Sequence, residues 1–263
     1  SEIGAALNAL EPLNIDLIGL NCATGPAEMS EHLRYLSKNA QCAISVMPNA
    51  GLPQLGPKGA TYPLGPDALA QALATFVDDY KITLIGGCCG TTPEHMAAVV
   101  ARLDRKQVTA RTSHADPGAS SLYQYVPFRQ DNAFLAIGER TNANGSRAFR
   151  DALISENWET CVEIARDQIR DGAHILDLSI DYVGRDGVSD MREIAGRFAT
   201  ASTLPIMLDS TEPPVLQAGL EQLGGRCIIN SVNYEDGDGP KSRFARIMPL
   251  VVEHGASVVA LTI

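Results

Sequence analysis

The chain has 263 residues, 45% of them hydrophobic and 20% charged, which is typical of a packed globular protein with one α/β barrel or two smaller domains. The net charge of −10 argues against a nucleic-acid partner, because phosphate binding requires a basic surface. No apolar run is long enough to cross a bilayer and no signal peptide is evident, so we expect a cytoplasmic protein with no membrane partner.

Eight short apolar runs recur along the chain, and the dominant pattern is an apolar run followed by a polar loop and a helical segment. The runs are rich in Ile, Val and Leu and do not alternate with polar residues, which indicates strands buried on both faces of a parallel sheet. The predicted strands are 15–20, 43–47, 82–85, 134–137, 175–178, 206–208, 227–229 and 258–263.

Helical periodicity and proline positions define several of the intervening helices. Helices are predicted to start at Pro26, Pro66 and Pro93, since proline in the first turn loses no hydrogen bond. Thr92 is a candidate helix N-cap. Gly172 and Gly255 are candidates for the left-handed residue that follows the last turn of a helix. Two apolar helix faces are Met96, Val99, Val100 and Leu103, and Trp158, Val162, Ala165 and Ile169.

The strand–helix alternation predicts an α/β fold of the TIM (β/α)8 type, with polar residues gathered after the strands. The strand–helix alternation is interrupted once, over 105–131. We expect a linker without strands there, between one domain at 1–104 and a second at 132–263. Three strand–helix units precede this linker and five follow it. The chain therefore holds either two incomplete barrels, the last three units of one and the first five of the next, or one eight-stranded barrel.

Three of the six cysteines lie where chemistry is expected. Cys22 follows the first predicted strand, and Cys88 and Cys89 follow the third between glycines, whereas Cys42, Cys161 and Cys227 lie in apolar segments and are interpreted as core. Parallel strand ends meet at one edge, so three thiolates could occupy three of the four positions of a tetrahedral zinc site. A substrate thiol that binds zinc at the fourth position would lose its proton and become a nucleophilic thiolate. The alternative is that the Cys88–Cys89 pair is buried and structural.

The two cysteine segments, GLNCATGP and GGCCGTTPEH, resemble the homocysteine S-methyltransferase family over about residues 13 to 104. The resemblance implies that Cys22, Cys88 and Cys89 bind zinc and that the zinc binds the thiol of homocysteine. The segment MPNAGLP also resembles a loop of that family, but we assign it no catalytic role. Only the last three units of such a barrel are present, so most contacts to the amino-acid part of homocysteine would lie outside this chain.

Polar residues also end the strands of the second half. Asp177, Asp209 and Asn230 would converge on one pocket, together with Glu139 and Asn142. Carboxylate and amide groups suit the edge of an aminopyrimidinone ring, which carries both donors and acceptors, and a buried carboxylate could supply a proton. The alternative is that the Asp and Asn residues cap helices or turns.

The segments GERTNANGS, ILDLSIDYVG, IMLDS and IINSVN resemble the pterin-binding domain shared by dihydropteroate synthases and methyltetrahydrofolate methyltransferases. The resemblance implies folate contacts from Glu139, Asn142, Asp177, Asp209 and Asn230. The order of the two modules resembles the N-terminal half of cobalamin-dependent methionine synthases. It implies transfer of a methyl group from 5-methyltetrahydrofolate through cobalamin to zinc-bound homocysteine, in methionine biosynthesis. No D-x-H-x-x-G motif occurs, so the cobalamin-binding domain is expected elsewhere in a longer protein.

Two other interpretations remain open. The chain could be a single-barrel pterin-dependent methyltransferase or a dihydropteroate synthase-like enzyme, with its cysteines in the core. It could also be a zinc- and folate-binding fragment without turnover, because open sheet edges must normally be covered. We expect the isolated chain to be inactive in complete methyl transfer.

Overall fold

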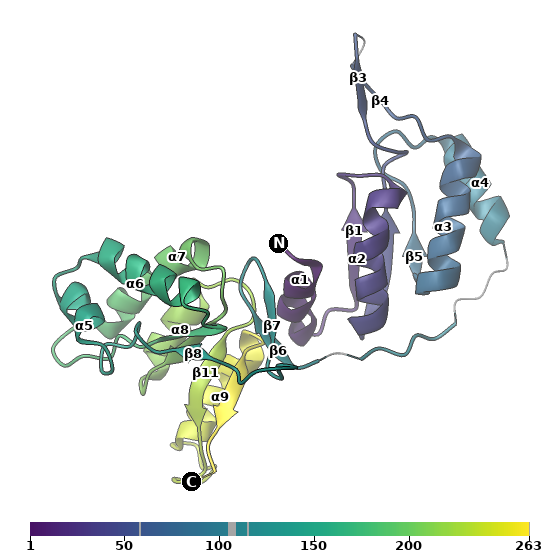
Figure 1. Cartoon of the computed structure of the whole chain (residues 1–263). Helices are drawn as coiled ribbons and strands as arrows, with labels where there is room; N and C mark the ends of the chain where they lie inside the picture. The colour runs from purple at the N-terminus through teal and green to yellow at the C-terminus, as the bar shows by residue number, and fades with distance from the viewer. Residues whose placement is uncertain (58, 105–108, 115, 263) are drawn as a thin grey trace. The chain divides into compact units, whose positions relative to one another are not determined.

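The computed structural model describes residues 1–57, 59–104, 109–114 and 116–262. The chain forms two compact units, one of residues Ile15–Ala115 and one that combines Ser1–Asn14 with Asp116–Ile263. Figure 1 shows the helices and strands of both units. None of the helices in the described residues is long and apolar enough to span a membrane.

The unit Ile15–Ala115 is built on a parallel sheet with the strand order β1-β2-β5. Each of its three strands is followed by a helix that starts with proline, and a short hairpin leaves the top of β2 (Figure 1). The strands are β1 (Leu17–Asn21), β2 (Ala43–Met47) and β5 (Leu84–Ile85). The helices are α2 (Pro26–Asn39), α3 (Pro66–Tyr80) and α4 (Pro93–Leu103), and the hairpin is β3 (Gln54–Gly56) with β4 (Gly59–Thr61).

Only one face of this three-stranded sheet is covered. Ile44 and Val46 of β2 are fully buried, together with helix residues such as Leu33, Leu36, Leu69 and Leu73. Side chains of the opposite face remain accessible: Leu17 and Leu84 are 40% and 45% exposed. The prediction of strands buried on both faces is therefore wrong for this unit, because the described residues provide a layer for one face only.

The second unit contains a parallel sheet of five strands in the order β12-β11-β10-β9-β8. Helices follow the strands in alternation, as expected for repeated βα units. The strands are β8 (Ile137–Gly138), β9 (Ile175–Leu178), β10 (Ile206–Asp209), β11 (Ile228–Val232) and β12 (Ser257–Ala260). The helices are α5 (Arg147–Ile154), α6 (Trp158–Arg170), α7 (Gly187–Ala201), α8 (Pro213–Leu220) and α9 (Arg243–Glu253).

Alternation along the five strands separates an apolar face from a mixed one. Leu176, Leu178, Leu208 and Ile229 join the large core formed with the helices. The alternate residues Ile175, Met207 and Ile228 form a smaller apolar cluster on the other face. Because side chains repeat every two residues along a strand, Asp177, Asp209 and Asn230 lie on this second face, two residues further toward the carboxyl ends.

The smaller cluster is closed by a hairpin that the sequence analysis did not predict. Strands β6 (Gly118–Ser120) and β7 (Tyr125–Pro127) pair in antiparallel fashion and place Ala119 and Val126 in the cluster. Helix α1 (Ile3–Leu10) packs on the hairpin and is followed by a 3-10 turn, η1 (Glu11–Leu13). The prediction of a linker without strands is therefore wrong for 118–127, while residues 105–108 and 115 lie outside the described residues.

The predicted strands and helix starts are otherwise confirmed. All eight apolar runs overlap a strand: the runs 43–47 and 175–178 coincide with β2 and β9, and the boundaries of the others differ by up to three residues. Helices α2, α3 and α4 begin at the predicted prolines, and Gly172 and Gly255 have the predicted left-handed φ of 89° and 60°. One residue of a predicted apolar face differs: Val100 of α4 is 69% exposed, although Val99 of the same face is buried, and Val162 and Ala165 of α6 are buried as expected.

Candidate functional site

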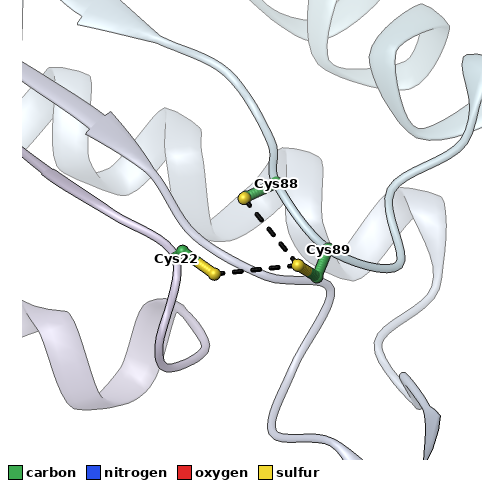
Figure 2. A group of neighbouring side chains, drawn as sticks. All are labelled: Cys22, Cys88 and Cys89. Atoms are coloured by element: carbon green, nitrogen blue, oxygen red, sulfur yellow. Dashed lines mark hydrogen bonds between the residues drawn. The ribbon is translucent and has the colours of Figure 1, made fainter.

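The three cysteines singled out in the sequence lie together at the carboxyl edge of the first sheet. The Sγ atoms of Cys22 and Cys89 are 3.7 Å apart, those of Cys88 and Cys89 are 3.9 Å apart, and all three lie within 4.8 Å of one another. Figure 2 shows the three side chains pointing toward a common centre from two separate loops. The other cysteines behave as core residues at Cys161 and Cys227, which are buried, while Cys42 is half-buried.

An unusual backbone conformation aims Cys22 at the other two thiols. Cys22 and Ala23 have φ angles of 66° and 63°, in the left-handed region that side chains other than glycine rarely adopt. The Cys22 N–H donates to the carbonyl of Met47 at 2.9 Å, which fixes the turn against β2. Strain of this kind persists only where the surrounding structure imposes it, and it occurs preferentially at functional sites.

The turn that carries Cys88 and Cys89 is held by the loop after β2. The Cys88 N–H donates to the Pro48 carbonyl at 2.8 Å, and the Cys89 N–H donates to Asn49 Oδ1 at 3.1 Å. Asn49 is 3% exposed, and its backbone N–H donates to the Thr24 carbonyl in the Cys22 loop at 3.0 Å. Asn49 lies in the MPNAGLP segment, which was assigned no catalytic role from the sequence and which connects the two cysteine loops.

Gly90 and Tyr62 pack against each other at the turn that carries Cys88 and Cys89. Gly90 has a φ of 79°, and a Cβ atom there would lie 2.3 Å from the Cβ of Tyr62. Tyr62 therefore packs directly on the Gly90 backbone. Its pKa is raised, chiefly by its hydrogen bond with the Cys89 side chain. No pattern in the sequence distinguishes Tyr62, because its position depends on the preceding hairpin.

The thiols influence one another's protonation. The pKa of Cys22 is lowered, first by a hydrogen bond from the Ala23 backbone N–H and then by hydrogen bonds with Cys89 and Cys88. The pKa of Cys88 is raised, first by its hydrogen bond with Cys22 and then by burial. The cluster therefore favours a thiolate at Cys22 before one at Cys88.

The donor set fits zinc. Zinc–sulfur bonds of about 2.3 Å in a tetrahedron place sulfur atoms about 3.8 Å apart, close to the two distances between these thiols. Three soft sulfur donors favour zinc over hard cations such as magnesium or calcium. A site with three protein ligands leaves a fourth position for a substrate atom.

The second group of predicted residues also converges. The Asn142 Nδ2 atom donates to Asp177 Oδ2 at 2.8 Å and to Asp209 Oδ2 at 3.0 Å. Asn142 Oδ1 accepts from the backbone N–H groups of Asn144 and Gly145, which fixes the orientation of the amide. Asp209 and Asn230 are adjacent across the paired strands β10 and β11.

Asp177 is a buried acceptor with unused capacity. It is 2% exposed, and its Oδ1 atom has no hydrogen-bond partner in the described residues. Its pKa is raised to about 6, chiefly by burial; the hydrogen bond from Asn142 opposes the shift, and the charges of Asp209 and Glu139 contribute to it. Burial also raises the pKa of Asp209. A ligand that donates from a ring N–H or amino group would satisfy this acceptor.

Two further side chains, neither of them predicted to contact the pterin ring, support these residues. Gln168, which is 2% exposed on α6, accepts from the Arg140 N–H at 2.6 Å and donates to Thr141 Oγ1 at 3.2 Å. It thereby fixes the segment that carries Glu139 and Asn142. Asp181 accepts from Ser210 Oγ at 2.8 Å and supports the turn after Asp209. Gln168 lies on an ordinary amphipathic helix, so no local signal identified it.

Comparisons with known proteins agree with the two modules. Residues 1–103 match the family model described as homocysteine S-methyltransferase, and residues 138–263 match the one described as pterin binding enzyme. Among solved structures, the carboxyl transferase domain of Rhizobium etli pyruvate carboxylase with oxamate and biotin matches at 15% identity. The match covers 96% of this chain and 42% of the carboxylase chain. Its TM-score is 0.27, which is too low to support a structural argument.

Two curated relatives are similar over the whole chain. Methionine synthase of Mycobacterium tuberculosis (strain ATCC 25618 / H37Rv) is 66% identical over 263 residues, and that of Mycobacterium leprae (strain TN) is 66% identical over 268 residues. The alignments cover 100% of this chain and 22% of each relative. The chain is therefore similar to methionine synthases over its whole length, and it spans 22% of the length of these curated relatives.

Proposed function

We propose that this chain supplies the thiol-activating centre and part of the folate site of a cytoplasmic methionine synthase. The observation that carries the proposal is the meeting of Cys22, Cys88 and Cys89 within 4.8 Å, from loops that follow different strands. The substrates are homocysteine and 5-methyltetrahydrofolate. The match of residues 1–103 to homocysteine S-methyltransferases and of 138–263 to pterin-binding enzymes supports both assignments.

Cys22, Cys88 and Cys89 would hold the zinc, and homocysteine would enter at the fourth position. Bound zinc lowers the pKa of an entering thiol until the thiolate predominates at neutral pH. The chain itself contributes the spacing of the sulfur atoms, which Asn49 maintains by joining the Cys22 and Cys89 loops through its hydrogen bonds with Thr24 and Cys89. In the complete reaction the N5–CH₃ bond of methyltetrahydrofolate breaks, the S–CH₃ bond of methionine forms, and the thiol proton is balanced by a proton gained at N5.

Glu139, Asn142, Asp177, Asp209 and Asn230 would bind the pterin ring. Asp177 and Asp209 would accept hydrogen bonds from ring N–H and amino groups, while Asn142 holds the two carboxylates side by side. With a pKa of about 6, Asp177 could exchange a proton close to neutral pH, which supports a role in balancing charge on the ring. Cobalamin, bound by other domains of the protein, would carry the methyl group between the two sites.

We further propose that the two units are parts of separate TIM-type barrels. One comprises the last three βα units of the homocysteine barrel within 1–104, and the other the first five units of the pterin barrel within 132–263, with 105–131 between them. The exposed sheet residues Leu17 and Leu84, and the exposed Val100 on α4, support this proposal, because further barrel units would cover them. A single barrel is disfavoured, because the three strands and the five strands form separate sheets.

Metal analysis of the purified chain tests the zinc assignment. We expect about one zinc per chain, and loss of most of it in Cys22→Ser, Cys88→Ser and Cys89→Ser. Cys42→Ala is the matched control in the same unit and should retain zinc. Equal zinc content in all variants would favour the alternative of a pterin enzyme with structural cysteines.

A separate measurement tests the folate assignment. Binding of 5-methyltetrahydrofolate should be lost in Asp209→Asn and retained in Cys88→Ser, because the groups that carry the two sites belong to separate units. Methionine formation with added methylcobalamin and homocysteine then distinguishes a catalytic module from a binding module. Zinc and folate binding without methionine above background would identify the chain as a binding module only.

A further inference from the structure

Arg243, the first residue of α9, hydrogen-bonds the segments that directly follow the last paired residues of β10 and β11. Its Nε donates to the carbonyl of Ser231 at 2.7 Å, and its Nη1 and Nη2 donate to those of Thr211 and Ser210 at 3.2 and 3.0 Å. The pairing between β10 and β11 ends at Asp209 with Asn230. The guanidinium thus links β10 and β11 just beyond the last residues that these two strands pair.

The carbonyls that Arg243 binds directly follow the two polar residues of the pocket. Ser210 follows Asp209, and Ser231 follows Asn230. A planar guanidinium holds its donors in a fixed fork, so it sets the separation of the carbonyls that accept from it. Any change in that separation is transmitted through one peptide unit to the side chains of Asp209 and Asn230.

The position of Arg243 is itself fixed. Its backbone N–H donates to Asp236 Oδ2 at 2.9 Å, and Ser242 caps the helix by accepting from the Ala245 N–H at 3.1 Å. The rings of Tyr234 and Phe244 stack with centroids 4.8 Å apart, which ties the loop after β11 to the first turn of α9. On the other side, Asp181 accepts from the Thr211 N–H at 3.0 Å.

We propose that Arg243 is a positioning residue for the pterin pocket, setting the distance between the Asp209 carboxylate and the Asn230 amide. The inference rests on the proposed folate function. It adds that the affinity for an N5-methylated pterin depends on the Arg243 guanidinium. Arg243 is not one of the predicted pterin-binding residues and acts on them only through the strand ends. The positive charge near Asp209 is a secondary contribution, because it lowers the pKa of that carboxylate against the effect of burial.

Substitution of Arg243 in the 263-residue chain tests the inference. Arg243→Met should weaken binding of 5-methyltetrahydrofolate about tenfold or more, since hydrogen bonds from a charged donor are lost at three acceptors. Arg243→Lys keeps the charge but cannot form the fork, so it should recover only part of the affinity. Arg246→Met, an exposed arginine one turn along the same helix, is the matched control and should bind as the wild type does.

A double-mutant cycle separates positioning from general stability. If Arg243 acts through Asn230, then Arg243→Met should weaken binding much less in an Asn230→Ala background than in the wild type. Additive losses, or wild-type affinity in Arg243→Met, would overturn the inference. A change in the side-chain amide NMR signal of Asn230 in Arg243→Met, absent in Arg246→Met, supports it without any ligand, and an unchanged signal contradicts it.

The same experiment distinguishes the inference from the function on which it rests. If the wild-type chain does not bind 5-methyltetrahydrofolate, the proposed function fails and the inference fails with it. If the wild type binds and Arg243→Met binds equally well, only the inference fails.

Discussion

The Sγ atoms of Cys22 and Cys89 lie 3.7 Å apart, although 67 positions separate the two residues in the chain. Both of their loops are hydrogen-bonded to the carboxyl end of β2 or to the loop after it: the Cys22 N–H donates to the carbonyl of Met47, the last residue of β2, and the Cys89 N–H donates to Asn49 Oδ1. The middle strand of the sheet therefore sets the distance between the two sulfur atoms. This arrangement leads to specific expectations for the metal, the loop and the pocket.

Zinc removal should lower the stability of the unit Ile15–Ala115. A ligand that binds the folded state more tightly than the unfolded state stabilises it, and the three sulfur atoms meet only in the folded chain. Chelation should lower the midpoint of thermal unfolding of this unit by several degrees. Differential scanning calorimetry with and without chelator checks this, and Cys88→Ser should unfold at the same temperature under both conditions.

Asn49→Ala should weaken zinc binding, although Asn49 was not predicted from the sequence as a site residue. The substitution leaves the Cys89 N–H without its acceptor and frees the Cys89 turn, and outer-shell changes of this kind typically cost about 10- to 100-fold in metal affinity. Competition with a chromophoric chelator measures the change. Asn8→Ala alters a partly buried asparagine of the other unit and should leave zinc affinity as it is.

Gly90→Ala should be far more damaging than an alanine at another glycine of similar φ. A Cβ at Gly90 would collide with Tyr62, in addition to the strain of a φ of 79°. Gly172, with a φ of 89°, has no atom within 4 Å of such a Cβ, so Gly172→Ala carries only the backbone cost of about 1–2 kcal/mol. Zinc content and the unfolding midpoint of both variants provide the comparison; comparable effects would show that Tyr62 moves aside readily.

Asp177→Asn should stabilise the protein at neutral pH while it abolishes folate binding. The folded-state pKa of about 6 lies above the ordinary value of about 4, so the folded chain binds the proton more tightly than the unfolded chain between these values. Wild-type stability should therefore fall as pH rises from about 4 to 6 and stay reduced above it. Asparagine removes the buried charge, and the gain should be about 2 kcal/mol at pH 7.5 and negligible near pH 4.

Urea denaturation of the wild type and Asp177→Asn at pH 4, 6 and 7.5 measures this difference. Asp151→Asn, which changes an exposed carboxylate paired with Arg147, is the control and should show a much smaller effect. A destabilised Asp177→Asn at pH 7.5 would mean that the ionised carboxylate is well accommodated in the unliganded pocket.

The sequence by itself determined the strands, the proline-started helices and the residues that follow the strands. Those features are local: a run such as Ile175–Leu178 is apolar enough to be a buried strand in any parallel sheet, and proline fixes a helix start through its own ring. The convergence of Cys22, Cys88 and Cys89 could be predicted as well, because parallel strands end at one edge.

Only the tertiary structure decided which other groups serve these sites. Asn49, Gln168 and Arg243 act through hydrogen bonds to residues 12 to 40 positions away, so nothing in their neighbouring sequence distinguishes them from ordinary loop or helix residues. The hairpin β6–β7 formed within a segment expected to be a linker, because Ala119 and Val126 gain an apolar surface from Ile175, Met207 and Ile228. Burial of that surface is a property of the assembled sheet and not of the segment itself.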